Sequence, residues 1–134
     1  MPASTGLNSL VCGDPRVAGR KEGERIYCRV FQGNALPGKA SEALEVIRQQ
    51  VDLVRRTTGM LLVQVLQGDG EILIISSWRS AKDLRAYAES ALANDFVARL
   101  TPLLVAPPSV RSLAITLAVE GSEPFLLHDE GGEG

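Results

Sequence analysis

The amino-acid sequence predicts an α+β domain with a four-stranded antiparallel sheet and helical segments on one face of that sheet. Three patterns support this prediction: two apolar runs joined by GDG, a helical repeat of apolar residues from Ala40, and a second helical repeat after Ser80. With 134 residues, 45% hydrophobic and 22% charged, the chain has the composition and length of a globular domain with a core. We expect the domain at residues 25–120, between an N-terminal arm or leader (1–24) and a flexible C-terminal tail (121–134).

The first half of the predicted domain supplies a strand, a helix and a hairpin. RIYCRVFQG is rich in β-forming residues and predicts a strand that ends at Gly33. The apolar residues from Ala40 to Val54 recur at helical spacing, and Gly59 suits the end of that helix. MLLVQVLQ and EILIISSW should pair antiparallel, because the glycines and aspartate between them tolerate the backbone angles of a tight turn.

The second half supplies a helix, a further helical piece and a last strand. Ser80 and Asp83 form an S-x-x-D pattern that predicts a capped helix start. Asn94 or Asp95 is expected to cap a further helical piece, which a proline should interrupt near Thr101. SVRSLAITLAVE alternates and predicts the last strand. The order strand, helix, strand, strand, helix, strand is the split-βαβ, or ferredoxin-like, arrangement.

The predicted hairpin strands are apolar on both sides of the pleat. An antiparallel sheet with one face in water normally carries polar residues at every second position, and neither MLLVQVLQ nor EILIISSW does. Some other surface should therefore cover the second face. Because symmetric homodimers are the commonest soluble assemblies, we expect a homodimer formed by sheet-to-sheet packing.

Charge and cysteine content argue against several classes of protein. A formal net charge of -2 without a basic stripe makes nucleic acid an unlikely partner. No apolar run is long enough to span a membrane, and the first residues lack the pattern of a secretion signal, so a cytoplasmic location is expected. Cys12 and Cys28 are too few for a disulfide framework or a zinc site, and are expected to be reduced thiols.

Three segments resemble motifs of a known family. ALPGKASEAL follows the first strand, TTGMLLVQVLQ leads into the second, and SSWRSAKDLRAY crosses from the third strand into the second helix. In this order, over residues 25–119, they resemble the antibiotic biosynthesis monooxygenase domain. The resemblance implies a dimeric α+β barrel.

The resemblance also implies an activity. Family members that oxidise polyphenolic substrates without metal or flavin hold the substrate in an apolar cavity between sheet and helices, where an Asn and a Trp assist. Trp78 matches the family Trp by position, so its indole is expected to wall the cavity with its N–H toward a substrate oxygen. The first strand has no clear match to the family Asn. No cofactor and no metal are implied.

A second position departs from the family. Tyr87 stands where many relatives carry His, and the only histidine, His128, lies in the tail. The resemblance therefore does not imply the haem-degrading activity of one family branch, because that branch needs a domain His as iron ligand. Tyr87 becomes a candidate proton donor beside Trp78. The expected substrate-binding residues are Phe31, Gln32, Gln64, Ser76 and Phe96. For the polar residues of this set, a place at the sheet margin or a hydrogen bond across the dimer is an equal alternative.

Two functions stay open at the level of sequence. The first is a cofactor-independent monooxygenase-like enzyme that acts on a small aromatic or quinone-like substrate. The second is a non-catalytic dimeric module of the same fold, which binds a small ligand or only assembles. For Trp78 and Tyr87, packing in the core or at an interface is the alternative to a role in chemistry, and Phe31 and Phe96 are expected to fill core.

Overall fold

The computed structural model describes residues 25–123 and shows one antiparallel sheet of four strands. The strands are β1 (Tyr27–Asn34), β2 (Met60–Gln67), β3 (Glu71–Trp78) and β4 (Ser109–Ala114), in the order β2-β3-β1-β4. The hairpin of β2 and β3 forms as expected, and β1 pairs antiparallel with both β3 and β4. This confirms the predicted sheet and places β1 in its interior.

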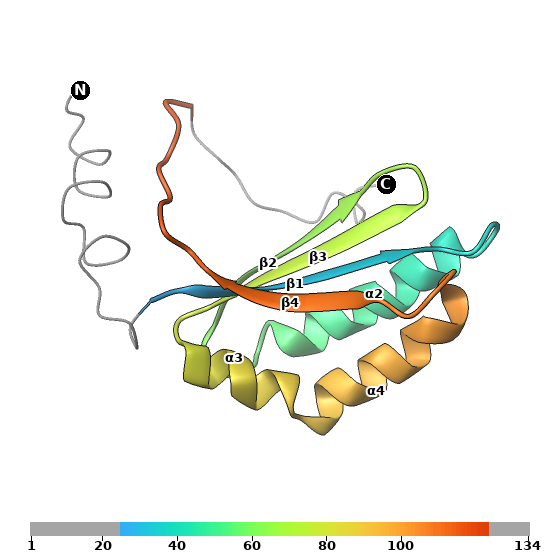
Figure 1. Cartoon of the computed structure of the whole chain (residues 1–134), viewed down its shortest axis with the longest axis horizontal. Coiled ribbons are helices and arrows are strands. Elements are labelled where there is room, and N and C mark those ends of the chain that lie inside the picture. Colours follow the sequence, from blue (N-terminus) through green and yellow to red (C-terminus); the bar gives the residue numbers. More distant parts are fainter. Residues whose placement is uncertain (1–24, 124–134) are drawn as a thin grey trace.

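All the helices of the described chain cover one face of the sheet (Figure 1). They are α2 (Ala40–Val54), α3 (Ala81–Ala88) and α4 (Ala91–Leu100), followed by a short 3-10 turn, η2 (Thr101–Leu103). The ferredoxin-like arrangement is therefore confirmed. Within residues 25–123, no helix has the length and hydropathy needed to cross a membrane. The predicted leader at 1–24, with Cys12, and the end of the tail, with His128, lie outside the described residues.

The start of α4 differs from the sequence prediction. Ser90 is the N-cap, since its hydroxyl accepts a hydrogen bond from the Ala93 amide at 3.2 Å. Asn94 and Asp95 lie inside the helix, so their prediction as caps was wrong: three cap-forming residue types stand close together, and the first of them starts the helix. The expected break near Thr101 is confirmed, because the α-helix ends at Leu100 and the 3-10 turn follows.

The last strand is shorter than its sequence pattern. Alternation continues to Val119, but β4 ends at Ala114, opposite Tyr27 at the beginning of β1. Beyond that point one backbone hydrogen bond, from the Ile115 amide to the Ile26 carbonyl, continues the pairing. The ladder stops because β1 offers no further partner residues.

The turn between β3 and α3 is closely packed against the start of β2. Ser80 caps α3 by accepting a hydrogen bond from the Asp83 amide at 3.1 Å, as the S-x-x-D pattern predicts. Arg79 donates to the Asp83 carboxylate at 2.7 Å and holds the pKa of that carboxyl below its usual value. Gly59 has a φ of +87°, and a Cβ atom there would lie 2.5 Å from the Asp83 Cβ. Only glycine fits this contact.

The core between sheet and helices consists of two clusters of buried side chains. One joins β1 and β3 to α2 and α4, and the other joins the ends of α2 and β3 to α3 and the start of α4. The first cluster contains Phe31, Ala43, Ile47, Ile72, Phe96, Leu100 and Leu104. The second contains Val54, Trp78, Leu84, Tyr87 and Ala93.

No described helix covers the opposite face of the sheet (Figure 1), and the strand register brings apolar side chains to it. We call this the outer face. The strand register places three rows of residues on this face: Leu66, Leu73, Gln32 and Ser109; Gln64, Ile75, Val30 and Arg111; Leu62, Ser77, Cys28 and Leu113. Leu66 and Leu113 are 45% and 48% exposed. Cys28 is a free thiol, 3.3 Å from the Ser77 hydroxyl.

Candidate functional site

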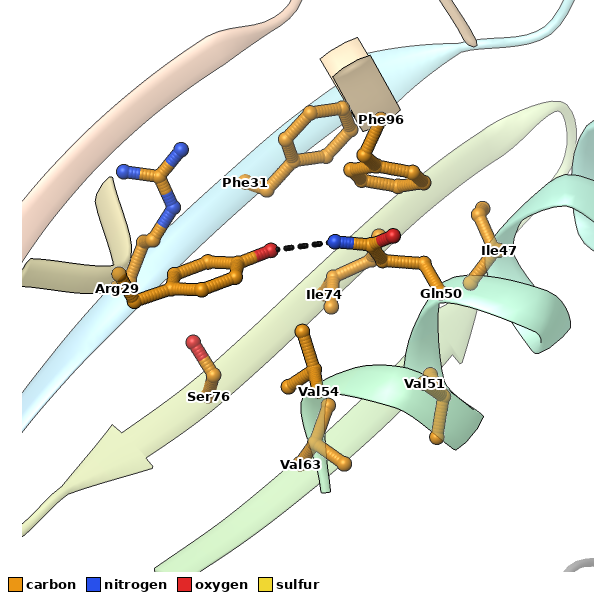
Figure 2. Close-up of a pocket in the computed structure, with 11 residues that line it drawn as sticks. Arg29, Phe31, Ile47, Gln50, Val51, Val54, Val63, Ile74, Ser76 and Phe96 are labelled. Carbon is orange, nitrogen blue, oxygen red and sulfur yellow. Dashed lines mark hydrogen bonds between the residues drawn. The ribbon is translucent and has the colours of Figure 1, made fainter. Parts of the chain in front are cut away.

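A pocket lies between the helix side of the sheet and the helices (Figure 2). The volume open to the centre of a water molecule is about 30 Å³, which is room for a few water molecules. Most of the wall is apolar and comes from α2, β2, β3 and the two phenylalanines of the core. Four lining residues carry polar side-chain atoms, namely Arg29, Gln50, Ser76 and Tyr87. The pocket therefore combines an apolar wall with a small cluster of polar side chains, as ligand sites commonly do.

A hydrogen bond between α2 and α3 forms part of the polar group. Gln50 Nε2 donates to Tyr87 Oη at 2.8 Å and also reaches the Leu92 carbonyl at 3.3 Å (Figure 2). Because Tyr87 Oη accepts here, its own hydrogen remains available for a ligand oxygen. Burial raises the pKa of Tyr87 above 10.0, with smaller opposing effects from Gln50 and Arg29. Tyr87 is thus a neutral hydrogen-bond donor at ordinary pH, and a poor base.

Arg29 brings a positive charge to the helix side of the sheet. Its guanidinium carbon lies 5.6 Å from the centre of the Tyr87 ring, over its face. Register places Ser76 of β3 and Ser112 of β4 on either side of it. Among residues 25–123, no ion pair between Arg29 and an Asp or Glu is present. Burial lowers the pKa of Arg29, in accordance with the cost of desolvating its charge.

Trp78 lies behind the pocket wall. It is fully buried, and its Nε1 donates to the Ser76 hydroxyl at 2.9 Å. Its ring stacks on the Tyr87 ring, with centroids 5.1 Å apart and an interplanar angle of 22°. Trp78 does not line the pocket, and it holds the tyrosine that does.

The structure brings together four of the residues that the sequence proposed for the site. Tyr87, Ser76, Phe31 and Phe96 all line the pocket. The rings of Phe31 and Phe96 lie 5.6 Å apart at 43°, and both side chains belong to the core, as expected. The aromatic wall and the core are therefore the same side chains.

Two further proposed residues lie elsewhere. Gln32 and Gln64 belong to the outer face, on the opposite side of the sheet from the pocket. Gln32 Nε2 donates to the Glu71 carboxylate at 3.2 Å in an exposed position. Gln64 is exposed next to Ile75 in the register.

Arg29 and Gln50 were not among the residues proposed from sequence, although a signal for each exists. Arg29 is two positions before Phe31, so strand alternation places both on the helix side. Gln50 lies three positions after Ile47 and four before Val54, on the apolar stripe of α2. A polar residue in phase with core residues marks both positions.

Within the part of the chain that the structure describes, no group of three or more His, Cys, Asp or Glu side chains is placed to hold a metal ion. The candidate site therefore consists of the pocket, its aromatic wall and the group formed by Arg29, Gln50, Ser76 and Tyr87.

Solved structures of low sequence identity share this fold. A candidate antibiotic biosynthesis monooxygenase from Caulobacter crescentus CB15 is 19% identical, with a TM-score of 0.62 over 74% of this chain and 94% of that one. One from Nitrosomonas europaea is 15% identical, with a TM-score of 0.62 over 71% and 93%. Rv0793 from Mycobacterium tuberculosis is 17% identical, with a TM-score of 0.61 over 73% and 99%. At these identities the likeness establishes the fold.

Sequence comparison identifies the family. No curated protein matches the chain. The family model described as antibiotic biosynthesis monooxygenase matches residues 26–99, which include every residue that lines the pocket. The chain therefore belongs to the antibiotic biosynthesis monooxygenase family.

Proposed function

We propose that the protein is a cofactor-independent monooxygenase-like enzyme that oxidises a small aromatic or quinone-like substrate in the pocket. The observation that carries this proposal is the pairing of an apolar, aromatic wall with two lining residues whose side chains can donate hydrogen bonds, Tyr87 and Arg29. Such a site excludes water from a ring and stabilises an oxyanion that forms on it. Family membership supports the same reaction class.

In the proposed reaction the substrate supplies the electrons that reduce dioxygen. A phenol or enol reacts as its anion after releasing a proton to solvent. The anion reacts with dioxygen at a ring carbon that carries one hydrogen, and this C–H becomes a carbonyl while hydroxide leaves and takes up the released proton. One oxygen atom enters the product, and the other leaves as water. The protein contributes orientation and charge stabilisation, which are the contributions that a preorganised dry site makes best.

The two residues first proposed for catalysis have different tasks in this scheme. Tyr87 donates its hydroxyl hydrogen to the substrate oxygen, while Gln50 holds the tyrosine oxygen from the other side. Trp78 acts as a positioning residue, because its ring stacks on Tyr87 and its N–H is bonded to Ser76. Phe31 and Phe96 hold the substrate ring.

Pocket size determines which substrates are expected to enter most readily. The free volume of about 30 Å³ admits the reacting edge of a ring, and a whole ring needs side chains at the pocket rim to move. Val65, on the helix side of the edge strand β2, is 40% exposed, so the helices leave this part of the sheet partly uncovered. We expect single-ring hydroquinones to enter more readily than naphthols or tricyclic anthrones.

The test is oxygen uptake by the purified full chain under air, without added metal or flavin, with a panel of hydroquinones, naphthols and anthrones. Uptake above the rate without protein is expected, and it should fall in Tyr87→Phe. Arg55→Gln is the matched control, since Arg55 is 67% exposed at the end of α2. Uptake that is absent for the whole panel, or equal in Tyr87→Phe, contradicts the enzyme.

A non-catalytic ligand-binding module is the second candidate. The observation that favours it is the chemistry of the wall, to which residues 25–123 contribute no Asp, Glu or His. Tyr87, with its raised pKa, does not replace such a base. Saturable binding of panel compounds without oxygen uptake would establish this alternative.

A homodimer through the outer face is the proposed assembly. Leu66, Leu73, Ile75, Val30 and Leu113 bring apolar side chains from all four strands to this face, which no described helix covers. Contiguous apolar surface of this kind marks association sites. A second copy of the chain fits the outer face, because a two-fold axis pairs the same surface with itself.

Sedimentation at micromolar concentration tests the assembly. We expect a dimer for the wild type and a monomer for Leu113→Glu, in which a charge would be buried at the interface. Val105→Glu is the matched control, because Val105 is 63% exposed and lies outside the four strands. A monomeric wild type contradicts the proposed dimer.

A further inference from the structure

We propose that the pocket selects ligands that carry an anionic oxygen, and that Arg29 is the residue that binds this oxygen. The inference deepens the proposed function, since it names the charge of the ligand that the same pocket takes. It stands on the position of Arg29 in the sheet, on the lack of a carboxylate partner among residues 25–123, and on the donors beside it.

The position of Arg29 is unusual for a cation. It belongs to β1, an interior strand, and points to the side of the sheet that the helices cover. Register aligns Val63, Ser76, Arg29 and Ser112 across the four strands, and the next row includes Phe31. Arginine at such a place is costly unless a partner neutralises it, because its charge is removed from much of the surrounding water.

That partner is missing from residues 25–123. The ion pairs that the structure describes there join Lys39 to Glu42, Arg55 to Asp52 and Arg79 to Asp83, all outside the pocket. What Arg29 has is the face of the Tyr87 ring, which attracts a cation but offers no anionic oxygen. Within residues 25–123, no salt bridge therefore consumes the five N–H donors of the guanidinium.

The groups around Arg29 extend the same preference. Tyr87 offers a hydroxyl hydrogen, because its oxygen already accepts from Gln50 at 2.8 Å. The Ser76 hydroxyl accepts from Trp78 at 2.9 Å, so its own hydrogen is likewise free to point into the pocket. Two hydroxyl donors at an apolar wall suit a ligand oxygen that only accepts, and the cation beside them favours one that also carries negative charge, such as a carboxylate, phenolate or enolate oxygen.

The experiment compares two probes of almost equal shape, benzoate and benzamide, with the full-length wild-type protein near neutral pH. Binding is followed by the fluorescence of the single tryptophan, Trp78, whose ring stacks on Tyr87, and independently by ligand-observed NMR. Benzoate should bind about tenfold more tightly or better, as expected for hydrogen bonds to a charged group. Equal binding of both probes, or binding of neither, overturns the proposal.

Variants assign the preference to one residue. Arg29→Met retains an unbranched apolar stem beside Tyr87 and should abolish the preference for benzoate, whereas Arg29→Lys should retain part of it. Arg55→Gln, which removes an exposed arginine of α2, should leave the preference intact. A preference for benzoate that persists in Arg29→Met overturns the assignment. Circular dichroism shows that each variant is folded, and the wild-type comparison does not depend on any variant.

A third probe separates a phenolate from a carboxylate as the source of the anionic oxygen. Para-nitrophenol changes absorbance when it ionises, so its protonation state is visible in the complex. Arg29 should lower the pKa of the bound phenol, which increases phenolate absorbance at pH values below the pKa of the free compound. A bound phenol that ionises no more readily than the free one, together with selective benzoate binding, assigns the site to carboxylates. Loss of both effects overturns the proposal.

Failure of this inference and failure of the proposed enzyme are distinguishable. Anion preference is measured by binding and needs no turnover, whereas the enzyme is tested by oxygen uptake. Selective benzoate binding without uptake supports the inference and contradicts the enzyme. Oxygen uptake with a substrate that stays neutral, together with no preference for benzoate, supports the enzyme and contradicts the inference.

Discussion

Gln50 Nε2 and Tyr87 Oη form a buried hydrogen bond of 2.8 Å that joins α2 to α3 beside the pocket. Gln50→Leu should destabilise the fold by about 1–3 kcal/mol, because it leaves the buried tyrosine hydroxyl without its partner. In a double-mutant cycle, Gln50→Leu combined with Tyr87→Phe should cost clearly less than the sum of the two single changes. Urea unfolding measures all four free energies.

The control for this cycle is Gln49→Leu, which removes a neighbouring amide on the exposed side of α2. Its cost should be the same in the wild-type and Tyr87→Phe backgrounds. Additive costs for Gln50→Leu and Tyr87→Phe would mean that the observed hydrogen bond contributes nothing to stability.

Alkaline pH should weaken the fold through Tyr87. Burial raises the pKa of Tyr87 in the folded protein above the value of 10.0 that it has when unfolded. Below pH 10 both states keep the proton, so this group does not change the unfolding free energy. Above pH 10 the unfolded chain releases the proton first, so the unfolding free energy falls as pH rises. Urea unfolding on either side of pH 10 should show a weaker decline in Tyr87→Phe; an unchanged slope contradicts the role of Tyr87.

Gly59 and Gly70 form a matched pair of glycines with positive φ, +87° and +81°. Gly70→Ala should cost about 1–2 kcal/mol from backbone strain alone, because nothing lies within 4 Å of its new methyl group. Gly59→Ala should cost roughly 1–3 kcal/mol more, since its methyl group would collide with the Asp83 side chain. Thermal or urea unfolding measures both losses of stability. Equal losses for Gly59→Ala and Gly70→Ala would show that the Asp83 side chain moves aside without cost.

The Trp78 indole depends on Ser76 for its hydrogen bond. Ser76→Ala should cost about 1–3 kcal/mol, because the fully buried N–H then has no partner. In a Trp78→Phe background the same change should cost much less. Ser77→Ala is the control: Ser77 is also buried but lies on the outer face beside Cys28, so its cost should be equal in both backgrounds. Circular dichroism during unfolding serves all of these variants.

Local patterns in the sequence were sufficient for most of the fold. Strand alternation, helical spacing and the S-x-x-D pattern at Ser80 each act over a few residues, and the structure confirms the elements that they predict. The predicted start of α4 was wrong because Ser90, Asn94 and Asp95 can all act as an N-cap. The preferences of these residue types do not decide which of them starts the helix. Family resemblance supplied what these patterns could not, the cavity between sheet and helices.

The polar group of the pocket was only partly predictable. Gln50 and Tyr87 are 37 positions apart in sequence, and their contact exists because α2 and α3 pack on the same sheet. Gln32 and Gln64 were proposed as pocket residues from their polarity alone; the register of β1 and β2 places both on the outer face. Strand parity counted from Phe31 would have selected Arg29 in place of Gln32.

The interior position of β1 has a consequence for how this site can diversify. Hydrogen-bonded ladders on both flanks fix the backbone at Arg29, so lengthening or remodelling the surface loops would leave the guanidinium where it stands. Changes in the loops would alter the size and shape of the molecules that can enter the pocket. Reversing the charge preference of the pocket would require a substitution at Arg29 itself.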